Sequence, residues 1–132
     1  MRVLVIGSKD WVDYNSVMRN LTVLIEDIHY KYPDEKKIVF VHSGGVGAET
    51  MSTEYIGKVE KYMRQKGYSL KEEVVFSKNV SNNAGRMAVD YDMITSGIDE
   101  AIVFSYGQDR RADYCIKILR EMNVPTKVVK DK

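Results

Sequence analysis

The sequence has one cysteine, two prolines and no long hydrophobic run, and these shortages exclude several classes of protein. Because Cys115 is alone, no internal disulfide can form, and the two histidines and this cysteine do not have the spacing of metal ligands. The apolar N-terminal stretch MRVLVIG is too short for a signal-peptide core or a membrane-spanning helix. We therefore expect a soluble cytoplasmic protein with no bound cofactor or metal, in which Cys115 is a small buried residue on a helix.

Excess charge of one sign is also lacking. Twenty Lys and Arg residues oppose nineteen Asp and Glu residues, which leaves a net charge of +1. Without a global positive field we expect no binding to nucleic acid or to a membrane surface, so any anionic ligand must be held by local groups. Hydrophobic residues make up 44% of the chain, which can fill one sizeable core. The length fits a single domain, residues 1–132.

Short apolar runs alternate with segments of helical periodicity along the chain. The runs are rich in β-branched residues and nearly continuous in apolar character, which is typical of strands covered on both faces. They span residues 2–7, 37–42, 73–77, 100–105 and 126–130. Because parallel strands need crossover connections, this alternation predicts an α/β fold. We expect a Rossmann-like three-layer sandwich with a five-stranded, mostly parallel sheet and helices on both faces.

Apolar spacing and capping residues predict a helix between each pair of strands. The first expected helix follows a cap at Asp13 or Asn15. The second covers residues 48–65, the third covers residues 85–95, and the fourth ends before Asn123. Met and Tyr residues are frequent on them, and such side chains must face either the core or a partner. The residues concerned include Tyr55, Tyr62, Met87, Tyr91 and Met93.

Three polar or glycine-rich segments directly follow predicted strands. They are GSKDW (residues 7–11), HSGGVGAE (residues 42–49) and SYGQDRR (residues 105–111). The carboxyl ends of parallel strands share one edge of the sheet, where ligands of such folds bind, so we expect these segments to converge there. Glycine packs no side chain and loses more entropy on ordering than any other residue. The glycines of the second segment therefore indicate that something approaches the backbone closely.

The chemistry of this edge favours a phosphorylated or nucleotide-like ligand. Gly44 and Gly45 allow backbone N–H groups to turn toward an anion, beside the positive end of the following helix. Lys9 and either Arg110 or Arg111 can add positive charge. Glu49, in the first turn of the helix, can accept hydrogen bonds from ribose hydroxyls. The segment GGVGAE matches neither the P-loop nor the dinucleotide-binding pattern, which gives a standard ATPase or dehydrogenase little support.

Each of these residues also has a purely structural interpretation. Trp11 can stack on a base or be a core aromatic residue, and His42 can be a satisfied histidine at a strand end. Glu49 can merely complement the helix dipole. The loop that carries Gly44, Gly45 and Gly47, called the glycine loop below, can be a tight turn without a ligand. The arginines at 110–111 can be a solvated helix start. Two cations there oppose the helix dipole, which either a bound anion or a cap at Asp109 would offset.

Four successive blocks of the chain resemble those of the YspA-like branch of the SLOG superfamily. The blocks are MRVLVIGSKDW, VHSGGVGAE, NNAGRMAVDYDMI and AIVFSYGQDRRADYCIKILREMNVPTKVV, and together they span nearly the whole chain. The residues matched in the first two blocks are Gly7, Ser8, Lys9, Trp11, His42, Gly44, Gly45, Gly47, Ala48 and Glu49. The resemblance implies a Rossmann-like pocket for nucleotides or NAD-derived molecules, in a protein that forms a homodimer or a higher oligomer.

The resemblance also suggests two activities. Lonely Guy-type relatives hydrolyse the N-glycosidic bond of nucleoside monophosphates, whereas other SLOG domains sense nucleotide signals in conflict systems. The last two blocks depart from the family pattern. In an ungapped match, an Arg-Asn pair falls on residues 88–89, with Arg86 two positions early. A Gly-Thr pair falls on residues 110–111, with Asp113 kept, and no carboxylate follows at the spacing of the family's catalytic glutamate.

We therefore favour a domain that senses or sequesters a nucleotide or an NAD- or ADP-ribose-derived ligand without turnover. The alternative is an N-glycosidase that uses Glu49 or Asp113 as its carboxylate. A protein-interaction module on an inherited fold is a third possibility. The residues expected to bind the ligand are Gly7, Ser8, Lys9, Trp11, His42, Ser43, Gly44, Gly45, Gly47, Glu49, Arg86, Ser105, Gly107, Arg110 and Arg111.

Overall fold

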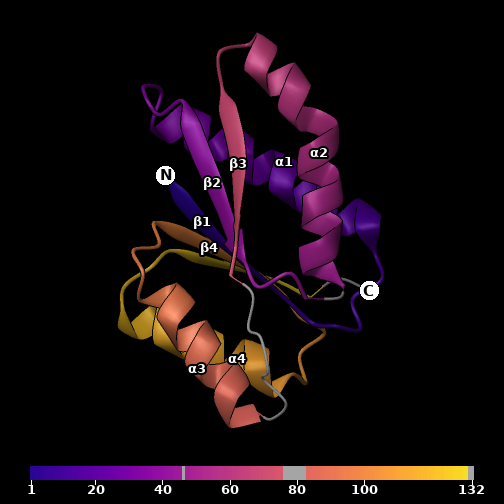
Figure 1. Cartoon of the computed structure of the whole chain (residues 1–132), viewed down its shortest axis with the longest axis vertical. Helices are drawn as coiled ribbons and strands as arrows, with labels where there is room; N and C mark the ends of the chain where they lie inside the picture. The colour runs from indigo at the N-terminus through magenta and orange to yellow at the C-terminus, as the bar shows by residue number, and fades with distance from the viewer. Residues whose placement is uncertain (46, 76–82, 131–132) are drawn as a thin grey trace.

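The computed structural model describes residues 1–45, 47–75 and 83–130, without the side chains of residues 83–86. Within these ranges strands and helices alternate strictly along the chain (Figure 1). The strands are β1 (Arg2–Gly7), β2 (Lys37–His42), β3 (Ser69–Val74), β4 (Glu100–Phe104) and β5 (Thr126–Val129). The helices are α1 (Tyr14–Lys31), α2 (Ala48–Gln65), α3 (Asn83–Ile94) and α4 (Arg110–Glu121).

The described strands form one parallel sheet in the order β3-β2-β1-β4-β5. The central strand β1 pairs with β2, where Val3 lies opposite Phe40, and with β4, where Val5 lies opposite Ile102. The chain builds outward from β1 to β3 and then crosses over to β4 and β5. The strand order therefore reverses between β1 and β4, and the carboxyl ends of these two strands mark the expected ligand position.

Two helices cover each face of the sheet, which confirms the predicted three-layer α/β sandwich (Figure 1). On β1, Val3 and Val5 point into the core beneath α1 and α2. Leu4 and Ile6 point into the second core, beneath α3 and α4. Because side chains alternate along a strand, a strand covered on both faces needs this continuous apolar run.

The predicted helices agree closely with the observed ones. Asp13 is the N-cap of α1, and its carboxylate accepts the backbone N–H of Ser16 at 3.0 Å. Helix α2 has the bounds expected from the sequence. Cys115 is fully buried on α4, where burial raises the pKa of its thiol. The interpretation of this cysteine as a small core residue is therefore confirmed.

The third strand does not lie where the sequence analysis placed it. A strand was expected over residues 73–77, but β3 covers Ser69–Val74, and residues 76 and 77 lie outside the described part of the chain. Strand β3 is at the edge of the sheet, and Leu70 is its one fully buried side chain. An edge strand carries polar and charged residues, so its apolar signal is weak. The prediction followed the more apolar residues that come after it.

The Met and Tyr residues noted on the helices divide between core and surface. Tyr55 and Met93 are buried, which confirms the core interpretation for these two, whereas Tyr62, Met87 and Tyr91 are exposed in the single chain. In the described part of the chain, no helix combines the length and the apolar character that crossing a membrane requires.

Candidate functional site

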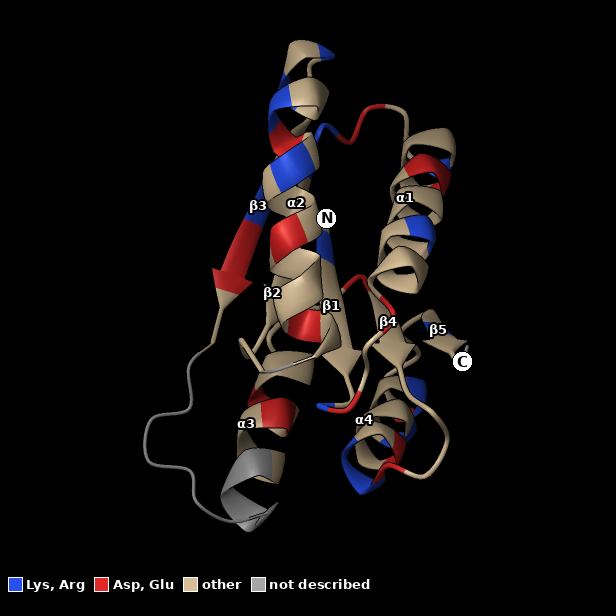
Figure 2. Ribbon diagram, turned by 90° about the vertical axis from the view of Figure 1, so that its right-hand side faces the viewer, with Lys and Arg blue, Asp and Glu red and all other residues tan. Residues whose placement is uncertain are grey.

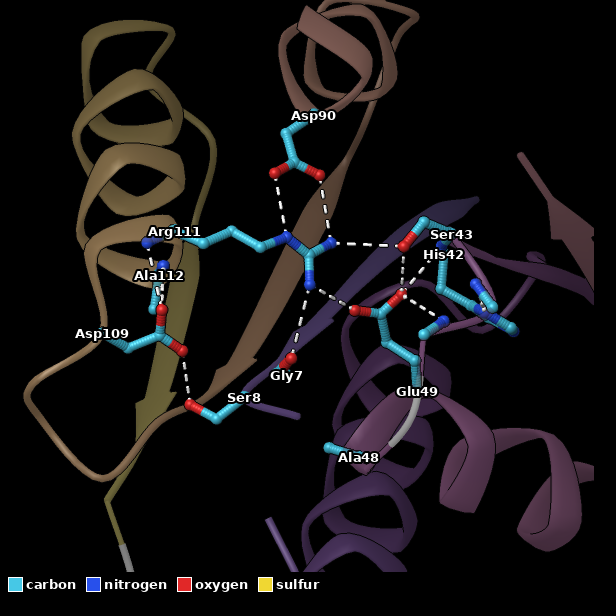
Figure 3. Close-up of polar contacts among 12 residues, drawn as sticks. Gly7, Ser8, His42, Ser43, Ala48, Glu49, Asp90, Asp109, Arg111 and Ala112 are labelled. Carbon is cyan, nitrogen blue, oxygen red and sulfur yellow. Dashed lines mark hydrogen bonds and ion pairs between the residues drawn. The ribbon is translucent and has the colours of Figure 1, made fainter. Parts of the chain in front are cut away.

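Arg111 lies at the centre of the carboxyl edge, where the segments after β1 and β2 meet the starts of α2 and α4 (Figure 3). Its Nε and Nη2 atoms donate to the two oxygens of Asp90 at 2.9 and 3.0 Å. Its Nη1 atom donates to Glu49 Oε2 at 2.8 Å and to the backbone oxygen of Gly7 at 3.4 Å. Nη2 also reaches the hydroxyl of Ser43 at 3.3 Å. One guanidinium group therefore connects β1, the segment after β2, and three helices.

Glu49 is the second centre of this network, and its side chain is completely buried. Its Oε1 atom accepts the Ser43 N–H at 2.8 Å, the Ser43 hydroxyl at 2.7 Å and the Gly45 N–H at 3.4 Å. Burial alone raises the pKa of this carboxyl group. The charge of Arg111 and the hydrogen bonds from Ser43 and Arg111 outweigh burial, so the pKa lies below its ordinary value.

The glycine loop therefore surrounds a carboxylate of its own chain. The N–H groups of Ser43 and Gly45 donate to Glu49, and the N–H of Gly44 donates to Nδ1 of His42 at 3.0 Å. We expected the N–H groups of Gly44 and Gly45 to face a bound anion. In this structure they are satisfied internally, because the first turn of α2 places Glu49 beneath the loop.

Asp90 was not among the predicted site residues, although it is fully buried and forms the bidentate half of the network. A signal for it exists in the sequence. Asp90 lies three and four residues before Met93 and Ile94, which are both buried, so it is on the apolar stripe of α3. A carboxylate on the buried face of a helix requires a cation or several hydrogen-bond donors, and Arg111 supplies them.

Arg111 also explains why two cations can begin a helix. Its positive charge is offset by Glu49 and Asp90, while Asp109 caps α4 by accepting the N–H groups of Arg111 and Ala112 at 3.0 and 3.2 Å. The carboxylate of Asp109 also accepts the hydroxyl of Ser8. Of the two explanations that the sequence left open, the cap at Asp109 is present in the structure. The bonds to Asp90 and Glu49 outweigh burial and hold the pKa of Arg111 above its ordinary value.

Two of the glycines are required by close backbone packing. A Cβ on Gly7 would lie 2.4 Å from the Cβ of Ala48. A Cβ on Gly47 would lie 2.4 Å from the carbonyl oxygen of Ser8, and the φ angle of Gly47 is +96°. The close approach that the sequence indicated is therefore made by the protein itself, where the segment after β1 packs on the start of α2.

Trp11 is in the core at the end of the sheet, with 1% of its surface exposed. Its ring stacks on Tyr106 at a centroid distance of 4.6 Å and meets the edge of Phe104 at 5.4 Å. The indole N–H donates to the backbone oxygen of Asp13 at 3.1 Å. These contacts support the core interpretation and leave no exposed ring face for a base.

His42 is also satisfied within the protein. It is 1% exposed, and Nε2 lies 2.8 Å from Glu72 Oε2 on β3. The hydroxyl of Thr53 donates to the same Glu72 oxygen at 2.8 Å. The structural interpretation of His42 thus holds, and the histidine ties the glycine loop to the edge strand.

The remaining predicted residues separate into two groups. Lys9, on the segment after β1, and Arg110, the first residue of α4, are exposed. Ser105, Gly107 and Asp113 line a cavity of about 500 Å³ between α4 and β5. The side chain of Arg86 lies outside the described part of the structure. Among the described residues, no three His, Cys, Asp or Glu side chains gather as metal ligands.

Acid should destabilise the protein through Glu49. The folded state holds the pKa of this carboxyl group below its ordinary value of 4.5. Its contribution to the free energy of unfolding is therefore present above pH 4.5 and is lost as the pH falls through the lower folded-state pKa. Urea denaturation of wild type and Glu49→Gln from pH 7 to pH 3 measures this dependence. Wild type should lose more stability than the variant. The exposed Glu54→Gln on the same helix should keep the wild-type profile, and a Glu49→Gln profile parallel to wild type would contradict the assignment.

No protein family model, curated protein or solved structure matches this chain. Its fold is established by the strand order and the layers described above, and its function must be inferred from the chemistry of the carboxyl edge.

Proposed function

We propose that this chain is a cytoplasmic domain that binds a nucleotide-like phosphorylated ligand at the carboxyl edge of its sheet without turning it over. The observation that carries the proposal is a lined cavity at that edge, together with a carboxylate that is not accessible. A cavity lined by the Ser105 hydroxyl and by both cationic and acidic side chains opens there, whereas the carboxylate of Glu49, beneath the glycine loop, is buried and paired.

The state of Glu49 favours binding over hydrolysis. Hydrolysis of an N-glycosidic bond passes through an oxocarbenium-like state and needs a carboxylate that reaches the anomeric carbon. Both oxygens of Glu49 are engaged by Ser43, Gly45 and Arg111, and its side chain has no exposed surface. Asp113 is exposed, but no described hydrogen bond fixes its carboxylate. Neither candidate carboxylate is both positioned and accessible.

The rigidity of the edge supports ligand capture. The network around Arg111 holds the segments after β1 and β2 and the start of α4 in one arrangement. A site that is already ordered loses less conformational entropy when a ligand binds. Lys9 and Arg110 are exposed beside this network, where they can attract an anion.

The first test is to identify what the protein carries. Purified protein is heat-denatured and any released small molecule is identified by mass spectrometry, while a panel of nucleotides, NAD and ADP-ribose is scored for thermal shift. We expect a co-purified nucleotide or a shift of several degrees, because a ligand that binds only the folded state stabilises it by mass action. An empty, unresponsive protein would favour an interaction module instead. Base released from the bound ligand, and lost in Asp113→Asn, would contradict binding without turnover.

A further inference from the structure

A groove between α4 and β5 is lined by the cationic side chains of Lys117, Arg120 and Lys130. Figure 2 marks the basic positions along α4 in blue. Lys117 and Arg120 lie one turn apart on α4, and Lys130 directly follows β5. None of the three side chains forms a hydrogen bond or an ion pair with a described residue, in contrast to the side chain of Arg111. Two acidic side chains, Asp113 and Glu121, also line the groove, so its lining carries three positive and two negative charges.

The groove begins at the carboxyl edge of the sheet. Ser105, the residue after β4, is 2% exposed and donates its backbone N–H to the oxygen of Val129 at 2.9 Å. Its hydroxyl accepts the N–H of Gly107 at 3.1 Å, and no described acceptor takes the hydroxyl proton. A buried hydroxyl that lines the cavity can therefore donate to a ligand oxygen.

An apolar floor completes the groove. Ile116 on α4 and Val128 on β5 line it and are both half-buried. A volume of about 500 Å³ lies within the usual range of ligand pockets, which combine an apolar surface with a few placed polar groups. This lining suits a small molecule that has an anionic group and an apolar ring.

We propose that this groove binds the phosphate group of a nucleotide-like ligand, against Lys117, Arg120 and Lys130. The ring of the ligand lies on Ile116 and Val128, and the carboxylate of Asp113 accepts its ribose hydroxyls. The inference rests on the proposed function and gives the ligand a position between α4 and β5, away from the glycine loop. The N–H groups of Ser43, Gly44 and Gly45 donate to Glu49 and His42, whereas the side chains of these three cations pair with no described residue.

The test follows amide resonances by NMR during titration with AMP, inorganic pyrophosphate and adenosine. Pyrophosphate and AMP should shift the amides of residues 105–107, of α4 and of Lys130, and adenosine, which has no phosphate, should bind much more weakly. Lys117→Gln with Arg120→Gln should weaken AMP binding about tenfold, as expected for the loss of two charge-assisted hydrogen bonds on an open surface. Lys61→Gln with Arg64→Gln removes the same two residue types at the same spacing on α2, and it should leave the affinity unchanged.

Two outcomes would overturn the inference in distinguishable ways. If Lys9→Gln with Arg110→Gln weakens AMP binding and the α4 double variant does not, the ligand lies over the central edge, so the proposed function stands and this position is wrong. If neither AMP nor pyrophosphate shifts any amide at millimolar concentration, the groove is not a phosphate site. Co-purification and the wider ligand panel then decide the proposed function separately.

Discussion

Replacing Arg111 with glutamine should lower the free energy of unfolding by about 3–5 kcal/mol at neutral pH, because it leaves two buried carboxylates without their cation. Glu49 and Asp90 are both fully buried, and Arg111 forms ion pairs with them at 2.8 and 2.9 Å. A glutamine side chain can donate one or two of these hydrogen bonds, but it supplies no charge. The loss is measured by urea denaturation at pH 7.

Arg110→Gln is the matched control for this change. Arg110 precedes Arg111 on the same helix turn but is exposed, and no described carboxylate pairs with it. Its loss should change stability by less than about 0.5 kcal/mol. Equal effects at the two positions would show that the buried network does not form in solution.

A double-mutant cycle separates the network from general damage to the fold. Glu49→Gln removes one of the two buried negative charges, so it should cost less in the Arg111→Gln background than in wild type. Additive losses would mean that Glu49 and Arg111 do not interact. The same cycle with Asp90→Asn tests the other half of the network.

The fold was predictable because each level of the sequence agrees with the others. Val3, Leu4, Val5 and Ile6 point alternately into two cores, which a continuous apolar run requires. The one misplaced strand, β3, has a single buried side chain, Leu70. The charged residues of β3 interrupt the apolar run that would mark a buried strand. Local sequence therefore reports buried strands well and edge strands poorly.

The candidate site was predicted in position but not in its internal pairing. The segments after β1, β2 and β4 do converge, because parallel strands share a carboxyl edge. The sequence does not show that Glu49 and Arg111, separated by 62 residues, neutralise each other. Nor does it show that α3 packs against α4 and brings Asp90 to the same guanidinium group. Residues chosen because they can bind an anion can equally bind one another, and only tertiary structure distinguishes the two cases.

Gly47→Ala tests what the glycines of the second segment are for. Packing predicts a loss of at least about 2 kcal/mol in the free energy of unfolding, with no ligand present. The new Cβ would lie 2.4 Å from the oxygen of Ser8 and 3.1 Å from that of Lys9, both of which are backbone atoms. The backbone angles, φ +96° and ψ −132°, are in a region that glycine alone occupies readily. Strained angles cost about 1–3 kcal/mol, and overlap in a packed region costs a similar amount.

Gly57→Ala is the same substitution, but we expect it to have the opposite effect on stability. Gly57 lies inside α2, and a Cβ there meets nothing within 4 Å. Because alanine orders in a helix at lower entropic cost than glycine, this variant should gain about 0.5–1 kcal/mol. Thermal and urea denaturation of the two variants therefore give changes of opposite sign if Gly47 serves backbone packing. If Gly47→Ala keeps wild-type stability, the segment after β1 does not pack on α2 as described.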